Sequence, residues 1–181
     1  NNMKNIKIGY VNVAANFKEE KVENKIRNIL ELGDNIEEFN KMDLLIFPES
    51  IMPYTFINQY NFDRSPLYSL FSKIDSNILI PTISNNEYTA YNTIMNLKYG
   101  TVKDTYKKEI LFPMGETLIF TEKLKIQSIF HSEGNLEIPK ENIYKFKINN
   151  INIIPFLCYE IFNLDYLESR LVGVSEMDLI T

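Results

Sequence analysis

The chain has 181 residues, an apolar fraction of 45% and a formal net charge of −5. This length and composition are typical of one globular domain, and we expect residues 1–181 to form a single one. The acidic balance gives no basic surface for nucleic acid, the single cysteine excludes an internal disulfide, and no apolar run is long enough to span a membrane.

The N-terminal third predicts a strand followed by a helix. Residues 6–14 alternate and are rich in β-branched side chains, which favours a strand. Residues 16–33 place Val22, Ile26, Ile29 and Leu30 on one helical face, and we expect this helix to stop at Gly33. Asn1 and Asn2 precede Met3, which is therefore either a natural start or a boundary within a longer chain.

Four further strands are predicted in the middle of the chain. Short apolar runs at 42–50 and 77–84 are typical of buried strands. Two more strands, Thr93 to Leu97 and Thr101 to Tyr106, are joined by a turn at Gly100. The order of strands and helices predicts a mixed, layered α/β domain.

The last third predicts a hairpin and a further strand. The hairpin turns at Asn149 and Asn150, and its second arm runs into Cys158. The segment "SEMDLIT" (175–181) has the pattern of another strand, and we expect the structure to continue past Thr181 in the intact protein.

Three of these apolar strands are followed by chemically reactive side chains, namely Glu49, Lys108 and Cys158. Sites in α/β sheets are usually built at the carboxyl ends of strands. A carboxylate can take the proton of a thiol, and a lysine can stabilise the oxyanion that forms when the thiolate attacks a carbonyl. The three residues together therefore indicate thiol-dependent acyl chemistry.

Each residue also has an ordinary structural interpretation. A single cysteine on an apolar strand is more often inert core than nucleophile. Glu49 fits a solvent-exposed strand end, and Lys108 lies in a Lys-Lys-Glu run typical of a solvated turn. His131 is the only histidine and is assigned to the surface, so a cysteine-histidine dyad or a histidine-rich metal site has little support.

The segments that carry these residues resemble the motifs of the nitrilase, or carbon-nitrogen hydrolase, superfamily. "LLIFPES" (44–50) is similar to its strand-Pro-Glu motif, "YKKEILFPMGE" (106–116) to its Tyr-x-Lys-x-x-Leu segment, and "FLCYEIF" (156–162) to its cysteine elbow. Within the superfamily, Leu-x-Pro-x-Gly-Glu, Cys-Tyr-Glu and "PESIMP" (48–53) look most like the apolipoprotein N-acyltransferases.

The resemblance implies a four-layer α-β-β-α sandwich, incomplete at the C-terminus. It implies Cys158 as nucleophile, Glu49 as general base and Lys108 as oxyanion stabiliser, all converging on one pocket. Tyr159 would assist through its backbone N–H, and Glu116 and Glu160 are supporting candidates. It implies no cofactor and no metal.

Three functions remain open from the sequence. As an acyltransferase, the protein moves an acyl chain from a phospholipid through a thioester on Cys158 to the N-terminal amine of a lipoprotein. It would then lie at the bacterial inner membrane, held by segments outside this chain, with this domain in the periplasm. As a carbon-nitrogen hydrolase of small amides it would be cytoplasmic, and a binding domain that keeps only the scaffold is the third possibility.

Two segments rich in aromatic and aliphatic residues, 52–71 and 117–130, follow two of the proposed catalytic positions. An acyl chain requires an apolar trough, so we expect these segments to form mobile arms over the site. Ordinary helices packed on the core are the alternative interpretation.

Overall fold

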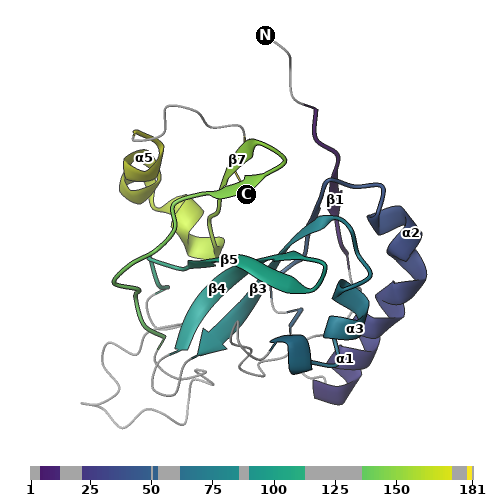
Figure 1. The fold of residues 1–181 in the computed structure, drawn as a ribbon. Helices are drawn as coiled ribbons and strands as arrows, with labels where there is room; N and C mark the ends of the chain where they lie inside the picture. Colours follow the sequence, from purple (N-terminus) through teal and green to yellow (C-terminus); the bar gives the residue numbers. More distant parts are fainter. Residues whose placement is uncertain are drawn as a thin grey trace, which may run out of the picture.

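The computed structural model describes residues 5–12, 22–49, 51–52, 62–85, 90–112, 136–172 and 179–180. Within these ranges the strands form two sheets (Figure 1). The first contains, in spatial order, β1 (Ile8–Tyr10), β2 (Leu44–Ile46), β3 (Asn77–Asn85), β4 (Ala90–Lys98) and β5 (Thr101–Lys107). The second contains β6 (Phe146–Ile148), β7 (Ile151–Ile154) and β8 (Leu179–Ile180).

Strand direction in the first sheet determines where its ends lie. β1, β2 and β3 are parallel, β4 is antiparallel to β3, and β5 is antiparallel to β4. Strands β2 and β5 therefore run in the same direction, and their carboxyl ends lie at the same edge of the sheet. This edge receives two of the three predicted catalytic residues.

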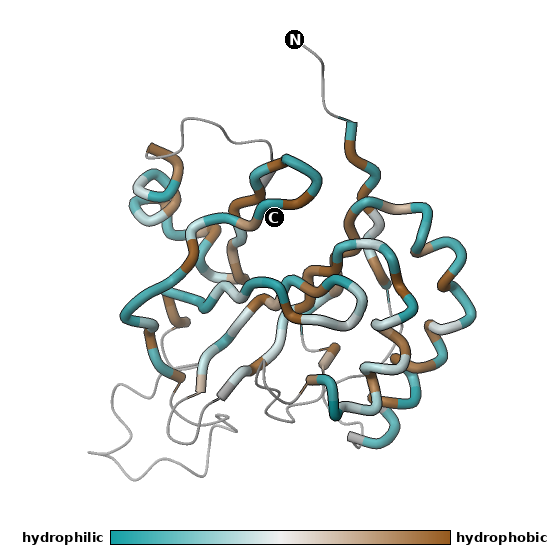
Figure 2. Tube along the Cα trace, in the orientation of Figure 1, coloured by the Kyte–Doolittle hydropathy of each residue, from teal (hydrophilic) through white to brown (hydrophobic). Residues whose placement is uncertain are grey.

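The strands of the first sheet bury both faces, because alternate side chains point to opposite sides. On one side Leu45 and Ile78 pack with Ile29 of α1 (Val22–Glu31) and Phe71 of α3 (Tyr68–Phe71). On the other side, Leu44, Leu79, Ile94 and Tyr106 pack against the second sheet through Phe146, Ile148, Ile151 and Ile153. Figure 2 shows hydrophobic residues along these central strands and a largely hydrophilic outer side of α1.

The helix α5 (Leu164–Val172) lies beside the second sheet (Figure 1). With α1 and α3 on the far side of the first sheet, the order of layers is that of an α-β-β-α sandwich. The expectation of a mixed, layered α/β fold is confirmed.

The helix predicted to stop at Gly33, α1, ends two residues earlier, at Glu31. The chain then continues through a 3₁₀ turn (Leu32–Asn35) into α2 (Ile36–Phe39). The chain remains helical beyond Gly33 because Ile36 and Phe39 pack against the core, and this burial stabilises the additional turns.

Both predicted hairpins are confirmed. Tyr99 and Gly100 connect β4 and β5 with φ values of +51° and +71°, and Asn149 and Asn150 connect β6 and β7 with φ values of +47° and +63°. Two successive positive φ values are the signature of the tight turn that matches the twist of antiparallel strands.

Gly100→Ala is expected to destabilise the protein by about 1–2 kcal/mol. The position has φ +71°, and an added Cβ would lie 2.9 Å from the ring of Tyr68. Urea unfolding measures the loss. Gly33→Ala is the matched control, because a Cβ there meets only Leu70 at 3.7 Å, and it should be neutral or stabilising. Equal unfolding midpoints for the two variants would contradict the prediction.

The prediction of a mobile arm at 52–71 is wrong for the part that the structure describes. Residues Phe62–Arg64 and Tyr68–Phe71 are helical, and Phe62, Leu67 and Phe71 are buried in the core. Their apolar side chains pack inward, in agreement with the alternative interpretation. Residues 53–61 and the second predicted arm, 117–130, lie outside the described residues.

Among the described helices, none is both long and apolar enough to cross a bilayer.

Candidate active site

The same edge of the first sheet carries Glu49 and Lys108. Glu49 follows β2 and is exposed, and the backbone N–H of Phe47 donates to Leu79 O at 2.9 Å, which prolongs the strand pairing toward the site. Lys108 follows β5, and its own N–H donates to Asn92 O at 2.7 Å. The backbones of β2 and β5 lie roughly 14 Å apart, because β3 and β4 separate them. Only long side chains such as Glu and Lys can reach a common point from these positions.

Lys108 does not lie in a solvated turn. Its relative exposure is 1%, so the ordinary interpretation of the Lys-Lys-Glu run is wrong at this position. Burying a lysine is costly, and lysines are almost never fully buried without specific interactions. The side chain points into the protein at the edge where sites are built in such sheets.

Cys158 is exposed, so it is not an inert core thiol. It is the first residue of a 3₁₀ turn (Cys158–Phe162) that follows the extended Leu157. Its φ is +49°, a left-handed conformation that costs a non-glycine residue roughly 1–2 kcal/mol. The chain therefore turns sharply at Cys158 and presents the thiol at the surface, and such strained residues cluster at active sites.

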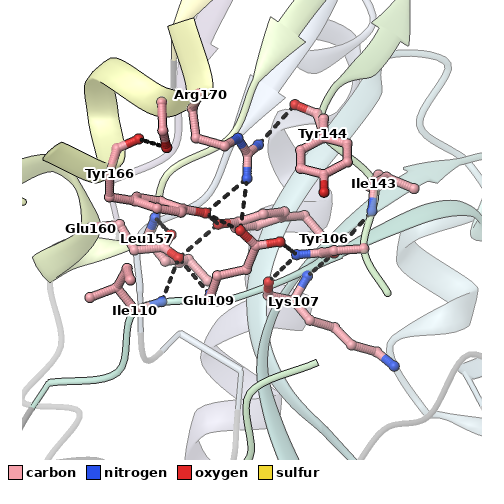
Figure 3. Close-up of polar contacts among 12 residues, drawn as sticks. Tyr106, Lys107, Glu109, Ile110, Ile143, Tyr144, Leu157, Glu160, Tyr166 and Arg170 are labelled. Atoms are coloured by element: carbon pink, nitrogen blue, oxygen red, sulfur yellow. Dashed lines mark hydrogen bonds and ion pairs between the residues drawn. The ribbon is translucent and has the colours of Figure 1, made fainter. Parts of the chain in front are cut away.

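Glu160 connects the Cys158 turn to the segment that follows Lys108 (Figure 3). Its side chain is completely buried. One carboxylate oxygen accepts from the Tyr106 hydroxyl at 2.7 Å and from the N–H groups of Glu109 and Ile110 at 2.6 and 3.2 Å. The other accepts from Leu157 N–H at 2.8 Å. Glu160 thus holds the backbone before Cys158 and the backbone after Lys108 on one carboxylate.

The remaining predicted residues are placed less directly. The Tyr159 ring is half-buried and packs edge-on against Phe112, with ring centroids 5.3 Å apart. Glu116 and His131 lie outside the described residues. Among the residues that are described, no group of three His, Cys, Asp or Glu side chains is arranged to hold a metal ion.

A buried polar cluster behind the site was not predicted from the sequence. It consists of Tyr106, Glu109, Tyr166 and Arg170. The Tyr166 hydroxyl donates to Glu109 Oε2 at 2.6 Å, and Arg170 Nη1 donates to the Tyr166 oxygen at 2.9 Å (Figure 3). Tyr166 and Arg170 are four residues apart on α5, and this spacing places them on one face of the helix. The spacing is the sequence feature from which this part of the cluster could have been predicted.

Arg170 is enclosed by aromatic rings. Its guanidinium carbon lies 5.1–5.7 Å from the ring centroids of Tyr106, Tyr144, Phe156 and Tyr166. Its Nη2 donates to Tyr144 O at 2.8 Å, and its Nη1 lies 3.6 Å from Glu109 Oε2. Ring faces and a carboxylate compensate for the loss of water around the buried charge.

The two tyrosines of this cluster remain protonated donors. Burial is the main reason that the pKa of Tyr106 is raised far above its usual range, and the neighbouring Glu160 adds to the shift. Burial, followed by the hydrogen bond to Glu109, likewise raises the pKa of Tyr166. The hydroxyl protons therefore stay available to the two carboxylates.

No family model and no curated protein sequence matches the chain. Solved structures do match it, and their fold is that of the nitrilase superfamily. An amidase of this superfamily from Nesterenkonia aligns with a TM-score of 0.65 and 11% identity over 97% of this chain and 63% of its own. A glutamine-dependent NAD⁺ synthetase from Acinetobacter baumannii aligns with a TM-score of 0.64 and 15% identity over 99% of this chain and 32% of its own. A carbon-nitrogen hydrolase superfamily protein from Xanthomonas campestris aligns with a TM-score of 0.54 and 15% identity over 89% of this chain and 56% of its own.

At these identities the likeness establishes the fold, and function has to be argued from the site. The chain spans between about a third and two thirds of the length of these three structures.

Proposed function

We propose that this chain is the catalytic domain of a thiol-dependent acyl-transfer enzyme. The observation that carries the proposal is the exposed Cys158 at a left-handed turn, joined through buried Glu160 to the segment that holds buried Lys108. Glu49 at the same sheet edge supplies the carboxylate that such chemistry requires.

In the first step the Cys158 sulfur attacks the carbonyl carbon of an acyl donor, and Glu49 takes the thiol proton. Lys108 and the Tyr159 N–H stabilise the oxyanion. The tetrahedral intermediate collapses, the bond to the leaving oxygen or nitrogen breaks, and Glu49 returns the proton to that atom. The acyl group is then held as a thioester on Cys158.

In the second step an acceptor attacks the thioester and regenerates the thiol. Glu49 takes a proton from the acceptor and passes it to the departing thiolate. With an amine as acceptor the reaction is N-acylation, and with water it is hydrolysis. The same residues serve both outcomes, so the acceptor defines the enzyme.

The finer proposal is N-acylation, with a phospholipid as donor and the N-terminal amine of a lipoprotein as acceptor. Its support is the sequence resemblance in "PESIMP", Leu-x-Pro-x-Gly-Glu and Cys-Tyr-Glu. The contacts of Glu160 give the last motif a physical reason, since a side chain one methylene shorter would reach fewer of its four donors. This proposal includes a membrane location through segments outside this chain, with the domain in the periplasm.

Hydrolysis of a small amide is the second candidate. The observation that favours it is that the structural neighbours include an amidase and carbon-nitrogen hydrolases. An amide donor would leave as an amine, and water would release the acid from the thioester.

The test is to offer the full-length protein a phospholipid and, separately, a panel of small amides. We expect a long-chain acyl adduct on Cys158 with phospholipid, detected by peptide mass spectrometry, and its loss when an N-terminal lipopeptide amine is added. Glu49→Ala and Lys108→Ala should each lower adduct formation by at least about a hundredfold while the protein remains folded, as circular dichroism would show.

Two results would contradict parts of the proposal. Protein that hydrolyses an amide but never acquires an acyl adduct from phospholipid is a hydrolase and not the acyltransferase. Undiminished turnover of both substrate classes by Cys158→Ser would remove the thiol mechanism altogether.

A further inference from the structure

The backbone on either side of Lys108 is fixed by hydrogen bonds from other parts of the fold. Four successive residues take part, and their partners come from β4, from the loop before β6 and from the turn after Cys158. Lys107 N–H donates to Asn142 Oδ1 at 3.0 Å, Lys108 N–H to Asn92 O at 2.7 Å, and the N–H groups of Glu109 and Ile110 to Glu160 Oε1 at 2.6 and 3.2 Å.

The side chain of Glu109, directly after Lys108, is held at both carboxylate oxygens. Oε2 accepts from the Tyr166 hydroxyl at 2.6 Å and lies 3.6 Å from Arg170 Nη1. Oε1 accepts from Asn142 Nδ2 at 3.0 Å. Only 20% of the Glu109 side chain is exposed, so its negative charge is directed into this cluster and away from solvent.

Helix α5, whose residues Tyr166 and Arg170 contact the Glu109 carboxylate, begins directly after the turn at Cys158. The turn ends at Phe162, and α5 begins at Leu164. The backbone N–H of Glu109 is itself bonded to Glu160, two residues after Cys158. The nucleophile, the lysine segment and the start of α5 are thus joined in one hydrogen-bonded unit.

We propose that Tyr166 and Arg170 are positioning residues that hold the Glu109 carboxylate away from the nucleophile, so that Lys108 remains the charge that acts on the thiol. The proposal rests on the proposed function, in which Glu49 takes the proton of the attacking Cys158 thiol, and it adds that the charge of Lys108 favours loss of that proton. Neither residue needs to touch the substrate, since both contact Glu109; the Tyr166 hydroxyl also lies 3.0 Å from the Tyr106 hydroxyl, which donates to Glu160.

Charge explains why this restraint matters. The charged side chains of this hydrogen-bonded unit are Lys108, Glu109, Glu160 and Arg170, and Glu49 follows β2 at the same sheet edge as Lys108. A positive charge near a thiol favours the thiolate, and a negative charge disfavours it. A released Glu109 could pair with Lys108 or approach Cys158, and either movement would make the thiolate less favourable.

The experiment measures alkylation of Cys158 by iodoacetamide against pH in the full-length protein, followed on the Cys158 peptide by mass spectrometry. Tyr166→Phe keeps the ring but removes the hydroxyl that donates to Glu109. We expect the alkylation rate at pH 7 to fall three- to tenfold, with the midpoint shifted upward and the plateau at high pH unchanged. Tyr144→Phe is the matched control, because Tyr144 contacts Arg170 through its ring and its backbone oxygen. It should leave the profile unchanged.

The double variant Glu109→Gln/Tyr166→Phe separates charge from packing. If the released carboxylate causes the shift, removing its charge should restore the rate at pH 7 to within twofold of the wild type. A purely structural role predicts an additive loss of thermal stability with no movement of the alkylation midpoint. An unshifted midpoint in Tyr166→Phe, or a shift that the double variant keeps, would overturn the proposal.

Glu109→Gln alone covers the case in which Tyr166→Phe does not fold. The restrained carboxylate should have little influence on the thiol, so this variant should alkylate within twofold of the wild type at pH 7. A midpoint lowered by half a pH unit or more would show that the charge already acts on Cys158 and would refute the proposal. These readouts do not depend on catalytic turnover, so their failure is distinct from retained activity in Cys158→Ser, which refutes the proposed function.

Discussion

Glu160→Ala is expected to cost about 3–5 kcal/mol of unfolding free energy, because it leaves buried donors without an acceptor at a cost of about 1–3 kcal/mol each. Three backbone N–H groups, at Glu109, Ile110 and Leu157, lose their acceptor, and the Tyr106 hydroxyl keeps only its 3.0 Å contact with the Tyr166 hydroxyl. A typical domain has only about 5–15 kcal/mol of stability, so the variant should be marginally folded. Chemical denaturation followed by circular dichroism measures the loss.

Glu160→Gln is the informative comparison. Its carbonyl oxygen can still accept from the three donors that meet at Oε1, but its amide N–H₂ would face the N–H of Leu157. We expect a smaller loss of stability than for alanine. We also expect reduced reactivity of Cys158, because the unfavourable contact between the amide N–H₂ and the Leu157 N–H lies directly before Cys158. If Glu160→Ala unfolds within about 1 kcal/mol of the wild type, the carboxylate does not hold the two segments together.

The local features of the fold were predictable because their causes are local. Gly100 and the Asn149–Asn150 pair tolerate positive φ, so both hairpins could be located from the sequence, and each apolar run became a strand. The short helical turns that follow the first helix, Leu32–Asn35 and Ile36–Phe39, were not predictable in this way. There the contacts of Ile36 and Phe39 with the core, which are tertiary, decide the conformation.

In the candidate site, too, the residues with a local sequence signal were predictable and those brought together by tertiary contacts were not. Glu49, Lys108 and Cys158 could be selected because each follows a recognisable strand, and two exposures proved informative: Lys108 is buried and Cys158 is exposed. The supporting cluster could not be found, since its bonds join residues far apart in the sequence. Tyr106 and Glu160 are 54 residues apart, and Glu109 and Tyr166 are 57 apart.

The strain at Cys158 leads to a prediction that separates activity from stability. Cys158 is exposed, so replacing its thiol should cost little packing energy, yet activity should fall at least about a thousandfold, as is typical when a nucleophile is removed. Cys158→Ala keeps a Cβ at φ +49° and should have nearly wild-type stability. Cys158→Gly removes the Cβ and relieves the left-handed conformation.

Glycine should therefore exceed alanine at position 158 by about 0.5–1 kcal/mol in unfolding free energy, after allowing for the greater flexibility of glycine in the unfolded chain. Both variants should be inactive. Asn150→Gly is the control: it has φ +63° in a hairpin turn, so it tests the same backbone effect without loss of activity. If the glycine variant is more stable than the alanine variant, the backbone at position 158 is strained, and this strain is consistent with a catalytic role of Cys158. Equal or lower stability of the glycine variant relative to alanine would show that the turn at Cys158 stores no such strain, and the thiol would then be held at the surface by its neighbours alone.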